Sequence, residues 1–150
     1  MYKRILVPID GSPTAKRGMD EALRLARQQG ARVCLVSVTG LFVITPLLGR
    51  GAYVADVTQY LRDSAEKLLA LAAKLARSRG VAAETALVEF NGSHAAEAIV
   101  EQARKWRADL IVMGTHGRRG ISRFTLGSDA DLVARTSPVP VLLVKGRAAR

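Results

Sequence analysis

A glycine-rich segment is the part of the chain best suited to bind an anion. It begins at Gly114, directly after the apolar run 109–113, and ends at Gly127-Ser128, where a helical pattern starts. Glycines let backbone N–H groups approach a phosphate closely, and the N–H groups at a helix start attract negative charge. The segment also contains three basic side chains, Arg118, Arg119 and Arg123. These residue types predict a phosphate site.

A second polar loop, Asp10-Gly11-Ser12, follows the apolar run 4–9. In a parallel sheet, ligands bind at the carboxyl ends of the strands, where the strand order reverses. If the strands that precede Asp10 and Gly114 are neighbours, both loops line one crevice. That crevice would have the geometry of a nucleotide pocket.

Other kinds of site are not expected. The chain has no Walker loop, no Gly-x-Gly-x-x-Gly after a strand and no Gly-x-Ser-x-Gly elbow. Its only histidines are His94 and His116, and no Cys or His cluster has metal-ligand spacing. Asp10 could orient a water molecule or a metal ion, but it has no evident general base beside it. We therefore expect no catalytic residues, and the sequence does not decide whether a metal ion is held.

Strand-type runs alternate with amphipathic helical patterns, which predicts an α/β fold with a mostly parallel sheet and helices on both faces. We expect one domain over residues 1–150, without a linker or an internal repeat. The expected strands are 4–9, 32–38, one within 81–90, 109–113, and the run from Val139 to Val144. Helices are expected over 13–29, 54–79, 93–106 and 128–137.

Local signals support these helix boundaries. Ser12 is a good N-cap before Pro13, and Ser93 is a second candidate cap. Gly30 and Gly80 close two helices. The apolar residues expected to face the core from the long helix are Val57, Tyr60, Leu61, Leu68, Leu71, Ala72 and Leu75.

Three further features have a structural and a functional interpretation. Trp106 is expected to anchor packing rather than stack on a ligand. Cys34 lies in an apolar run and is expected to be a buried small side chain rather than a reactive thiol. The long apolar loop 39–52 either packs over the sheet edge or forms a lid or partner surface.

The formal net charge is +10, but the basic residues are scattered and form no run of five. Direct nucleic-acid binding is therefore not expected. No stretch approaches the about 18 apolar residues of a membrane span, and the start of the chain does not read as a signal peptide. A single cysteine suits a reducing compartment. We expect a cytoplasmic protein that does not bind membranes.

Several segments together resemble the ATP-binding universal stress proteins. Gly114-Thr115-His116-Gly117, nine residues and then Gly127-Ser128 match the Gly-x2-Gly-x9-Gly-Ser/Thr motif of that family. The opening Ile-Leu-Val-Pro-Ile-Asp-Gly-Ser, the Asp-Leu-Ile-Val-Met-Gly before the motif and the closing Ser-Pro-Val-Pro-Val-Leu-Leu-Val are also similar. The resemblance covers essentially the whole chain.

The resemblance implies a three-layer fold with a five-stranded parallel sheet of order 3-2-1-4-5. It implies a homodimer formed by antiparallel pairing of the last strands, which would also cover the apolar edge from Val139 to Val144. It implies a nucleotide-dependent stress or signalling regulator that binds ATP, with or without Mg²⁺, and turns it over little or not at all. The alternatives are a slow ATPase, and a nucleotide-free module that binds protein or nucleic acid.

By the same resemblance, Asp10 contacts the ribose or adenine side and Val38 contacts adenine through its backbone. Gly114, Gly117, Gly127 and Ser128 hold the ribose and the phosphates. The full set of expected nucleotide-binding residues is Pro8, Ile9, Asp10, Ser12, Val38, Met113, Gly114, Thr115, His116, Gly117, Arg118, Arg119, Gly127, Ser128 and Asp129. Asp129 is unusual there, because its charge lies near the phosphates; it either turns to solvent or helps to hold Mg²⁺.

Overall fold

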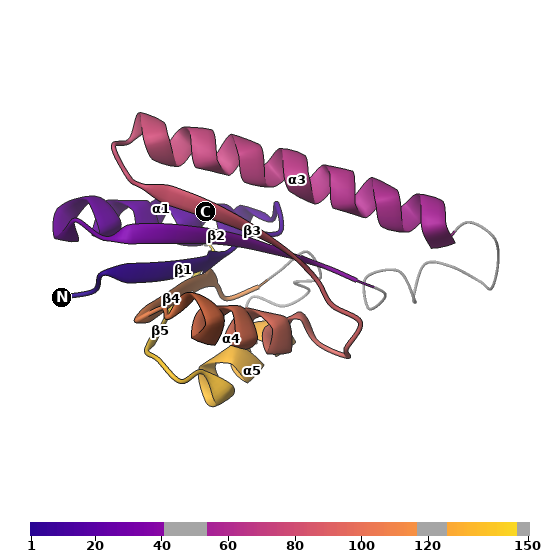
Figure 1. Cartoon of the computed structure of the whole chain (residues 1–150). Helices are drawn as coiled ribbons and strands as arrows, with labels where there is room; N and C mark the ends of the chain where they lie inside the picture. Colours follow the sequence, from indigo (N-terminus) through magenta and orange to yellow (C-terminus); the bar gives the residue numbers. More distant parts are fainter. Residues whose placement is uncertain (41–53, 117–125, 147–150) are drawn as a thin grey trace.

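A computed structural model describes residues 1–40, 54–116 and 126–146. In this part of the chain, strands and helices alternate as predicted (Figure 1). The strands are β1 (Arg4–Pro8), β2 (Arg32–Thr39), β3 (Ala83–Glu89), β4 (Leu110–Gly114) and β5 (Val141–Val144). The helices are α1 (Pro13–Gln29), α3 (Val54–Ser78), α4 (Ala95–Trp106) and α5 (Ser128–Thr136).

The strands form one parallel sheet of order β3-β2-β1-β4-β5, so the predicted topology is confirmed. β1 pairs with both β2 and β4: Ile5 lies opposite Val33 on one side and opposite Leu110 on the other. The strand order reverses between β1 and β4. The loops that leave these two strands therefore open at one edge of the sheet.

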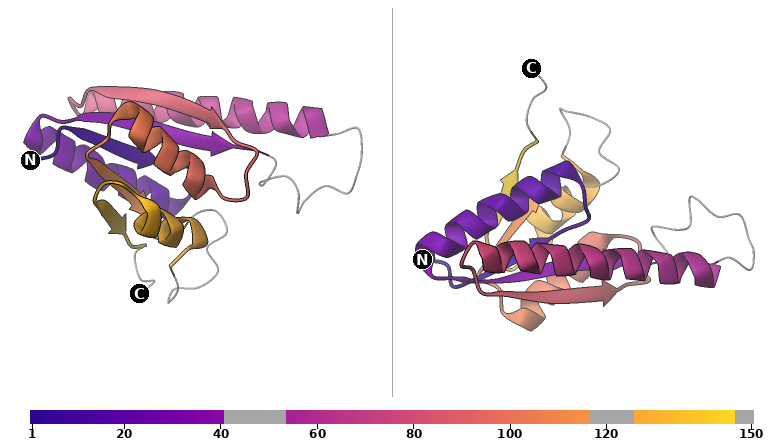
Figure 2. Two further views of the ribbon diagram at one scale, coloured as in Figure 1. Left: turned by 60° about the horizontal axis from the view of Figure 1, so that its bottom comes forward. Right: turned by 90° about the horizontal axis from the view of Figure 1, so that it is seen from above.

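The helices cover both faces of the sheet, as Figure 2 shows from two further directions. α1 and α3 pack on one face over a core that includes Ile5, Val7 and Leu35. α4 and α5 pack on the other face over a core that includes Leu6, Val36 and Ile111. Neighbouring residues of β1 thus pack into opposite cores, which is why the buried stretches of the central strands are mostly apolar.

Most of the predicted helix boundaries are confirmed. The Ser12 hydroxyl accepts a hydrogen bond from Ala15 N at 3.2 Å, and Pro13 is the first residue of α1. Gly30 and Gly80 follow α1 and α3 with φ of 62° and 74°. This left-handed backbone disfavours side chains with a Cβ.

Three local predictions are wrong. The N-cap of α4 is His94 rather than Ser93, and it makes no side-chain cap hydrogen bond. Tyr60 and Leu71 on α3 are 70% and 68% exposed instead of facing the core. α3 packs on the sheet through small side chains such as Ala72 and Ala76, and part of it extends past the sheet (Figure 1). β5 starts at Val141, two residues later than expected.

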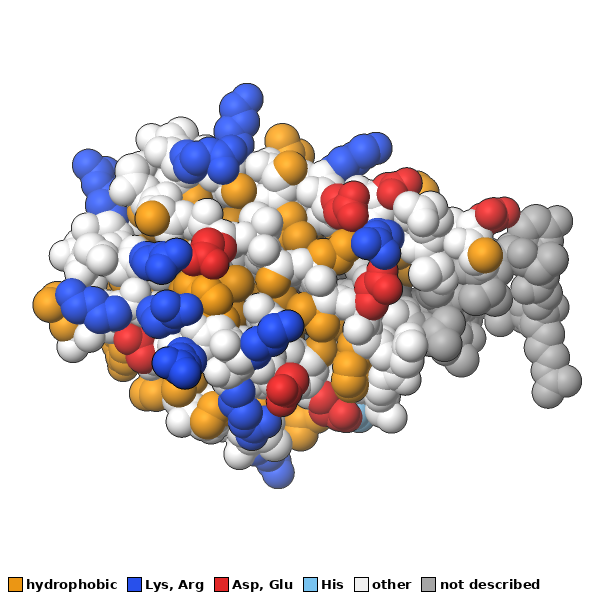
Figure 3. All heavy atoms as spheres, in the orientation of Figure 1, with side chains coloured by type: hydrophobic (Ala, Val, Ile, Leu, Met, Phe, Trp, Pro, Cys, Tyr) orange, Lys and Arg blue, Asp and Glu red, His pale blue; other side chains and the backbone are white. Residues whose placement is uncertain are grey.

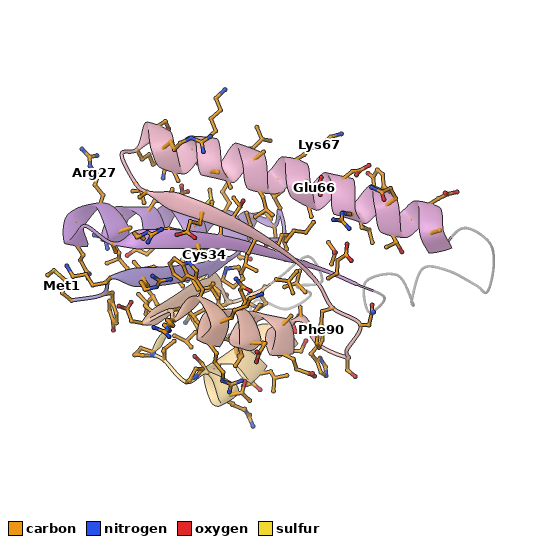
Figure 4. All side chains as sticks on the ribbon, in the orientation of Figure 1. Met1, Arg27, Cys34, Glu66, Lys67 and Phe90 are labelled. Atoms are coloured by element: carbon orange, nitrogen blue, oxygen red, sulfur yellow. The ribbon has the colours of Figure 1, made fainter. Side chains whose placement is uncertain are left out.

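Two packing predictions are confirmed. Trp106 is 9% exposed, and its ring lies under the Arg4 guanidinium at 4.3 Å. Cys34 is buried between the strands and α4 (Figure 4). No helix in the described ranges has both the length and the apolar character that crossing a bilayer requires. The predicted apolar loop 39–52 lies outside the described residues except for Thr39 and Gly40.

Candidate functional site

The predicted site residues gather at the carboxyl edge of the sheet, because β1 and β4 are neighbours there. Asp10 and Ser12 follow β1, Val38 lies near the end of β2, and Thr115 and His116 follow β4. Asp10 folds its own loop, since its Oδ1 accepts a hydrogen bond from Ser12 N at 2.9 Å. Gly117, Arg118 and Arg119 lie outside the described residues.

The backbone at the two ends of the glycine-rich segment is held closely together. Gly127 N donates a hydrogen bond to Thr115 O at 2.8 Å, which places the start of α5 beside the end of β4. A Cβ added to Gly127 would lie 3.0 Å from Thr115 O. Glycine is therefore needed at 127 for the close approach of the two backbones.

Gly114 is required by the packing of α1. A Cβ at this position would lie 2.6 Å from the Thr14 carbonyl carbon and 2.9 Å from Ala15 N, both backbone atoms. One turn later in α1, a Cβ on Gly18 would lie 3.0 Å from Gly114 N. The first turns of α1 thus rest directly on the backbone where β4 ends. Gly114 thus allows the loop after β4 to lie against the start of α1, which follows the other loop of the site.

Thr14 was not among the predicted site residues, yet its hydroxyl links the two loops. Thr14 Oγ1 donates a hydrogen bond to His116 O and lies 3.3 Å from Ser12 Oγ. His116 Nδ1 in turn lies 2.9 Å from Thr115 Oγ1. Threonine is common in the first turn of a helix, so no signal in the sequence points to this contact. It becomes evident only when the fold places Thr14 opposite the residues that follow β4.

The helices α1, α4 and α5 begin at this edge, and they differ in how their N–H groups are satisfied. α1 is capped by Ser12. α4 receives its side-chain hydrogen bond from α5, since Ala96 N donates to Asp129 Oδ1 at 3.1 Å. α5 itself has no side-chain cap hydrogen bond from the described residues. The start of α5 lies beside Thr115, and the N–H groups and positive dipole end of a helix start suit an anion.

The hydrogen bond from Ala96 N to Asp129 gives a structural reason for an acidic residue next to Ser128. The side chain is half-buried, and one carboxylate oxygen lies at the positive end of α4. An acid at a helix N-terminus is stabilised by the helix dipole. One oxygen of the carboxylate is thereby engaged at α4, beside the segment expected to hold phosphates.

No metal site is evident in residues 1–40, 54–116 and 126–146, because no three His, Cys, Asp or Glu side chains gather there. A groove does run between α1 and β5, lined by Arg17, Asp20, Arg24, Leu142 and Lys145 among others. It lies beside the sheet edge, and one of its lining residues, Val144, accepts a hydrogen bond from Thr115 N at 3.0 Å.

The fold defines a class: a doubly wound α/β protein, in which the candidate site lies at the β1–β4 switch point. Comparison with known families makes this specific. Residues 1–145 match the model of the Universal stress protein family. The chain belongs to this family.

Individual relatives agree over nearly the whole chain. The universal stress protein MJ0531 of Methanocaldococcus jannaschii is 35% identical over 145 residues, which are 97% of this chain and 83% of that protein. A solved structure of a family protein from Burkholderia pseudomallei is 33% identical, with a TM-score of 0.79, covering 95% of this chain and 96% of that one.

Two solved relatives hold adenine nucleotides. A universal stress protein from Archaeoglobus fulgidus was solved in complex with dAMP; it is 26% identical, with a TM-score of 0.69, and covers 96% of this chain and 98% of that one. Another universal stress protein was solved with cAMP; it is 26% identical, with a TM-score of 0.68, and covers 96% and 97%.

Proposed function

We propose that this chain binds ATP at the crevice between the β1 and β4 loops, and that it acts as a nucleotide-dependent regulator with little or no turnover. The observation that carries the proposal is the start of α5. It is held against Thr115 by the Gly127 hydrogen bond and carries no side-chain cap from the described residues. The relatives with dAMP and cAMP support an adenine nucleotide as the class of ligand.

The spacing of the glycine-rich segment favours ATP over a monophosphate. Gly114, Gly117, Gly127 and Ser128 match a family motif associated with ATP. In this proposal the Ser128 N–H and hydroxyl donate to phosphate oxygens, while the Gly127 N–H stays bonded to Thr115 O and Gly127 lets the backbone approach the phosphates closely. Arg118 and Arg119 supply charge from the interior of the motif.

The base and sugar would lie on the β1 and β2 side of the crevice. Asp10 accepts from the ribose or the adenine, and the backbone of Val38 contacts adenine, with Pro8, Ile9 and Met113 forming the apolar floor. Because no three metal-ligating side chains gather in the described residues, a Mg²⁺ ion would be held chiefly by the phosphates. Magnesium usually keeps several waters and few protein ligands in such sites.

Calorimetry with ATP, with and without Mg²⁺, tests the binding directly. Ser128→Ala should weaken ATP binding about tenfold, the usual worth of a hydrogen bond to a charged group. Ser78→Ala is the matched control, because Ser78 is also an exposed helix-terminal serine, and its hydroxyl donates only to Leu75 O. Absence of any ATP binding to the unsubstituted protein would refute the proposal. Mass spectrometry of small molecules released on denaturation would identify a copurifying nucleotide.

A slow ATPase is the alternative at the same site. Steady-state phosphate release would be measured for the protein and for Asp10→Ala. Equal background rates would dismiss turnover, whereas loss of a measurable rate in the variant would favour the enzyme.

The homodimer is part of the same proposal. β5 is an edge strand of the sheet, and Leu142 on it is 36% exposed. An unpaired apolar edge tends to be covered or paired, and antiparallel pairing of two copies through Val139 to Val144 would do this. Sedimentation should report a dimer, and Leu142→Lys should shift it toward the monomer. A monomeric parent protein would refute this interface.

A further inference from the structure

Within the described residues, positive charge is concentrated at the edge of the sheet opposite the proposed nucleotide site. At this edge the strands start and the helices end. This edge consists of the last turn of each helix, the connection that follows it and the first residues of each strand. It contains ten basic side chains and two acidic ones, Glu84 and Asp109. The rest of the described chain contains seven basic and eleven acidic side chains. We name these ten basic residues the basic edge: Lys3, Arg4, Arg27, Arg32, Arg77, Arg79, Arg104, Lys105, Arg107 and Arg135.

The basic edge is accessible, and half of it has no acidic partner. All of its side chains are exposed except that of Arg4, which is half-buried against Trp106. Four of its arginines form ion pairs, with Glu84, Asp20, Glu101 and Asp131. The remaining five form no ion pair with any described residue: Lys3, Arg27, Arg77, Lys105 and Arg107.

Figure 3 shows this concentration: blue side chains predominate at the left end, and red ones are more frequent toward the right. Figure 4 places Met1 and Arg27 at that left end, whereas Lys67 lies over the middle of α3. Basic residues in a last helical turn also complement the helix dipole. The dipole does not account for Lys3, because it precedes β1 and follows no helix.

Arg107 supplies an independent observation. It follows α4 with φ of 55°, the one non-glycine residue of the described chain with positive φ. The residues at the same place after α1 and α3 are Gly30 and Gly80. An arginine therefore stands at α4 where α1 and α3 have glycine, and its charge is added to the basic edge.

We propose that the basic edge binds the phosphate backbone of nucleic acid without regard to sequence. Eight of its ten side chains are arginine, whose planar guanidinium pairs with phosphate through two hydrogen bonds. A protein partner or an inserted membrane anchor would require an exposed apolar centre. Apart from Met1, the large exposed apolar side chains of the described residues lie elsewhere, at Tyr60, Leu71, Leu126 and Leu142. The basic edge therefore presents mainly positive charge, which suits the phosphate backbone of nucleic acid.

The test is the salt dependence of binding to a fluorescently labelled DNA duplex of mixed sequence, measured by anisotropy on the full chain. Five unpaired cations predict a slope of log K against log salt of about −4.5. The variant Arg27→Gln/Arg77→Gln/Lys105→Gln should flatten it to about −2 and weaken binding at low salt at least tenfold. Saturating ATP with Mg²⁺ should leave duplex binding unchanged, because the nucleotide site lies at the other edge.

The matched control is Lys16→Gln/Lys67→Gln/Lys145→Gln, which removes the same charge away from the basic edge and should leave the slope unchanged. Three results would overturn the proposal. They are an equal loss of duplex affinity in both triple variants, displacement of the duplex by ATP, and no duplex binding at about 50 mM salt. So would edge-dependent binding to phosphatidylserine vesicles in place of the duplex. The salt slopes of the variants and the vesicle comparison do not depend on whether ATP binds.

Discussion

Replacing Asp129 tests how the two helix starts beside the proposed phosphate site are coupled. Asp129 Oδ1 accepts the Ala96 N–H at 3.1 Å, and α4 has no side-chain cap of its own. Loss of a cap costs about 1 kcal/mol, and loss of a charge at a helix start costs about 0.5 kcal/mol more. We therefore expect Asp129→Ala to lower the free energy of unfolding by about 1.5 kcal/mol. Asp129→Asn keeps the acceptor oxygen and should lower it by only about 0.5 kcal/mol.

The assay is thermal and urea unfolding of the nucleotide-free protein, followed by ATP titration of each variant. About 1.5 kcal/mol corresponds to a fall in Tm of roughly 3–6 °C for a chain of this size. If the carboxylate caps α4, Asp129→Asn binds ATP as the parent does, with the same Mg²⁺ dependence. If it instead ligates Mg²⁺, Asp129→Asn loses the part of the affinity that depends on Mg²⁺.

Asp131→Asn is the matched control, because it removes an acid from the same helical turn that pairs with Arg135 instead. Equal stability of Asp129→Ala and the parent protein would refute the capping role. Loss of stability in Asp129→Asn as large as that in Asp129→Ala would also contradict it, since the amide oxygen should serve as the acceptor.

Three further substitutions follow from the packing. Arg107→Gly should raise the free energy of unfolding by about 0.5–1 kcal/mol by relieving the left-handed backbone; an unchanged or lower urea midpoint would contradict this. Gly114→Ala should cost about 3 kcal/mol, because its Cβ meets Thr14 backbone at 2.6 Å; a normal Tm would contradict it. Burial, reinforced by the charge of Glu84, raises the pKa of Cys34 from 9.0 to about 11. As the pH rises, the thiol ionises in the unfolded chain before it ionises in the folded one. The free energy of unfolding should therefore fall between pH 9 and about 11 more steeply than in Cys34→Ala. Parallel pH profiles of the two proteins would refute the raised pKa.

The sequence alone determined the order and type of the elements, because their signals are local. Buried runs such as residues 4–9 can be strands only if both faces are covered. Ser12, Gly30 and Gly80 mark helix ends through backbone geometry that depends on neighbouring residues alone. The glycine spacing from Gly114 to Ser128 identified the strand-to-helix junction before its partners were known.

The exposure of Tyr60 and Leu71 was not predictable in this way. Their spacing fits an apolar stripe, but the stripe pattern does not say where the sheet ends beneath α3 or which side chains are small enough for close packing. The cap of α4 was missed for a similar reason. Its acceptor, Asp129, is 33 residues away in sequence and reaches Ala96 only because α4 and α5 pack side by side.

The charge distribution shows most clearly which features depend on the tertiary structure. In sequence the basic residues are scattered, and no run suggests a polyanion partner. Those at one helix end are separated from those at the next helix end by an entire strand and helix. The parallel order β3-β2-β1-β4-β5 returns every helix to the same edge, so these residues meet there. The sequence by itself determined the glycine-rich junction at one edge of the sheet; only the tertiary structure gathered the charge at the other, because parallel strands joined by crossover helices bring all helix ends to one side.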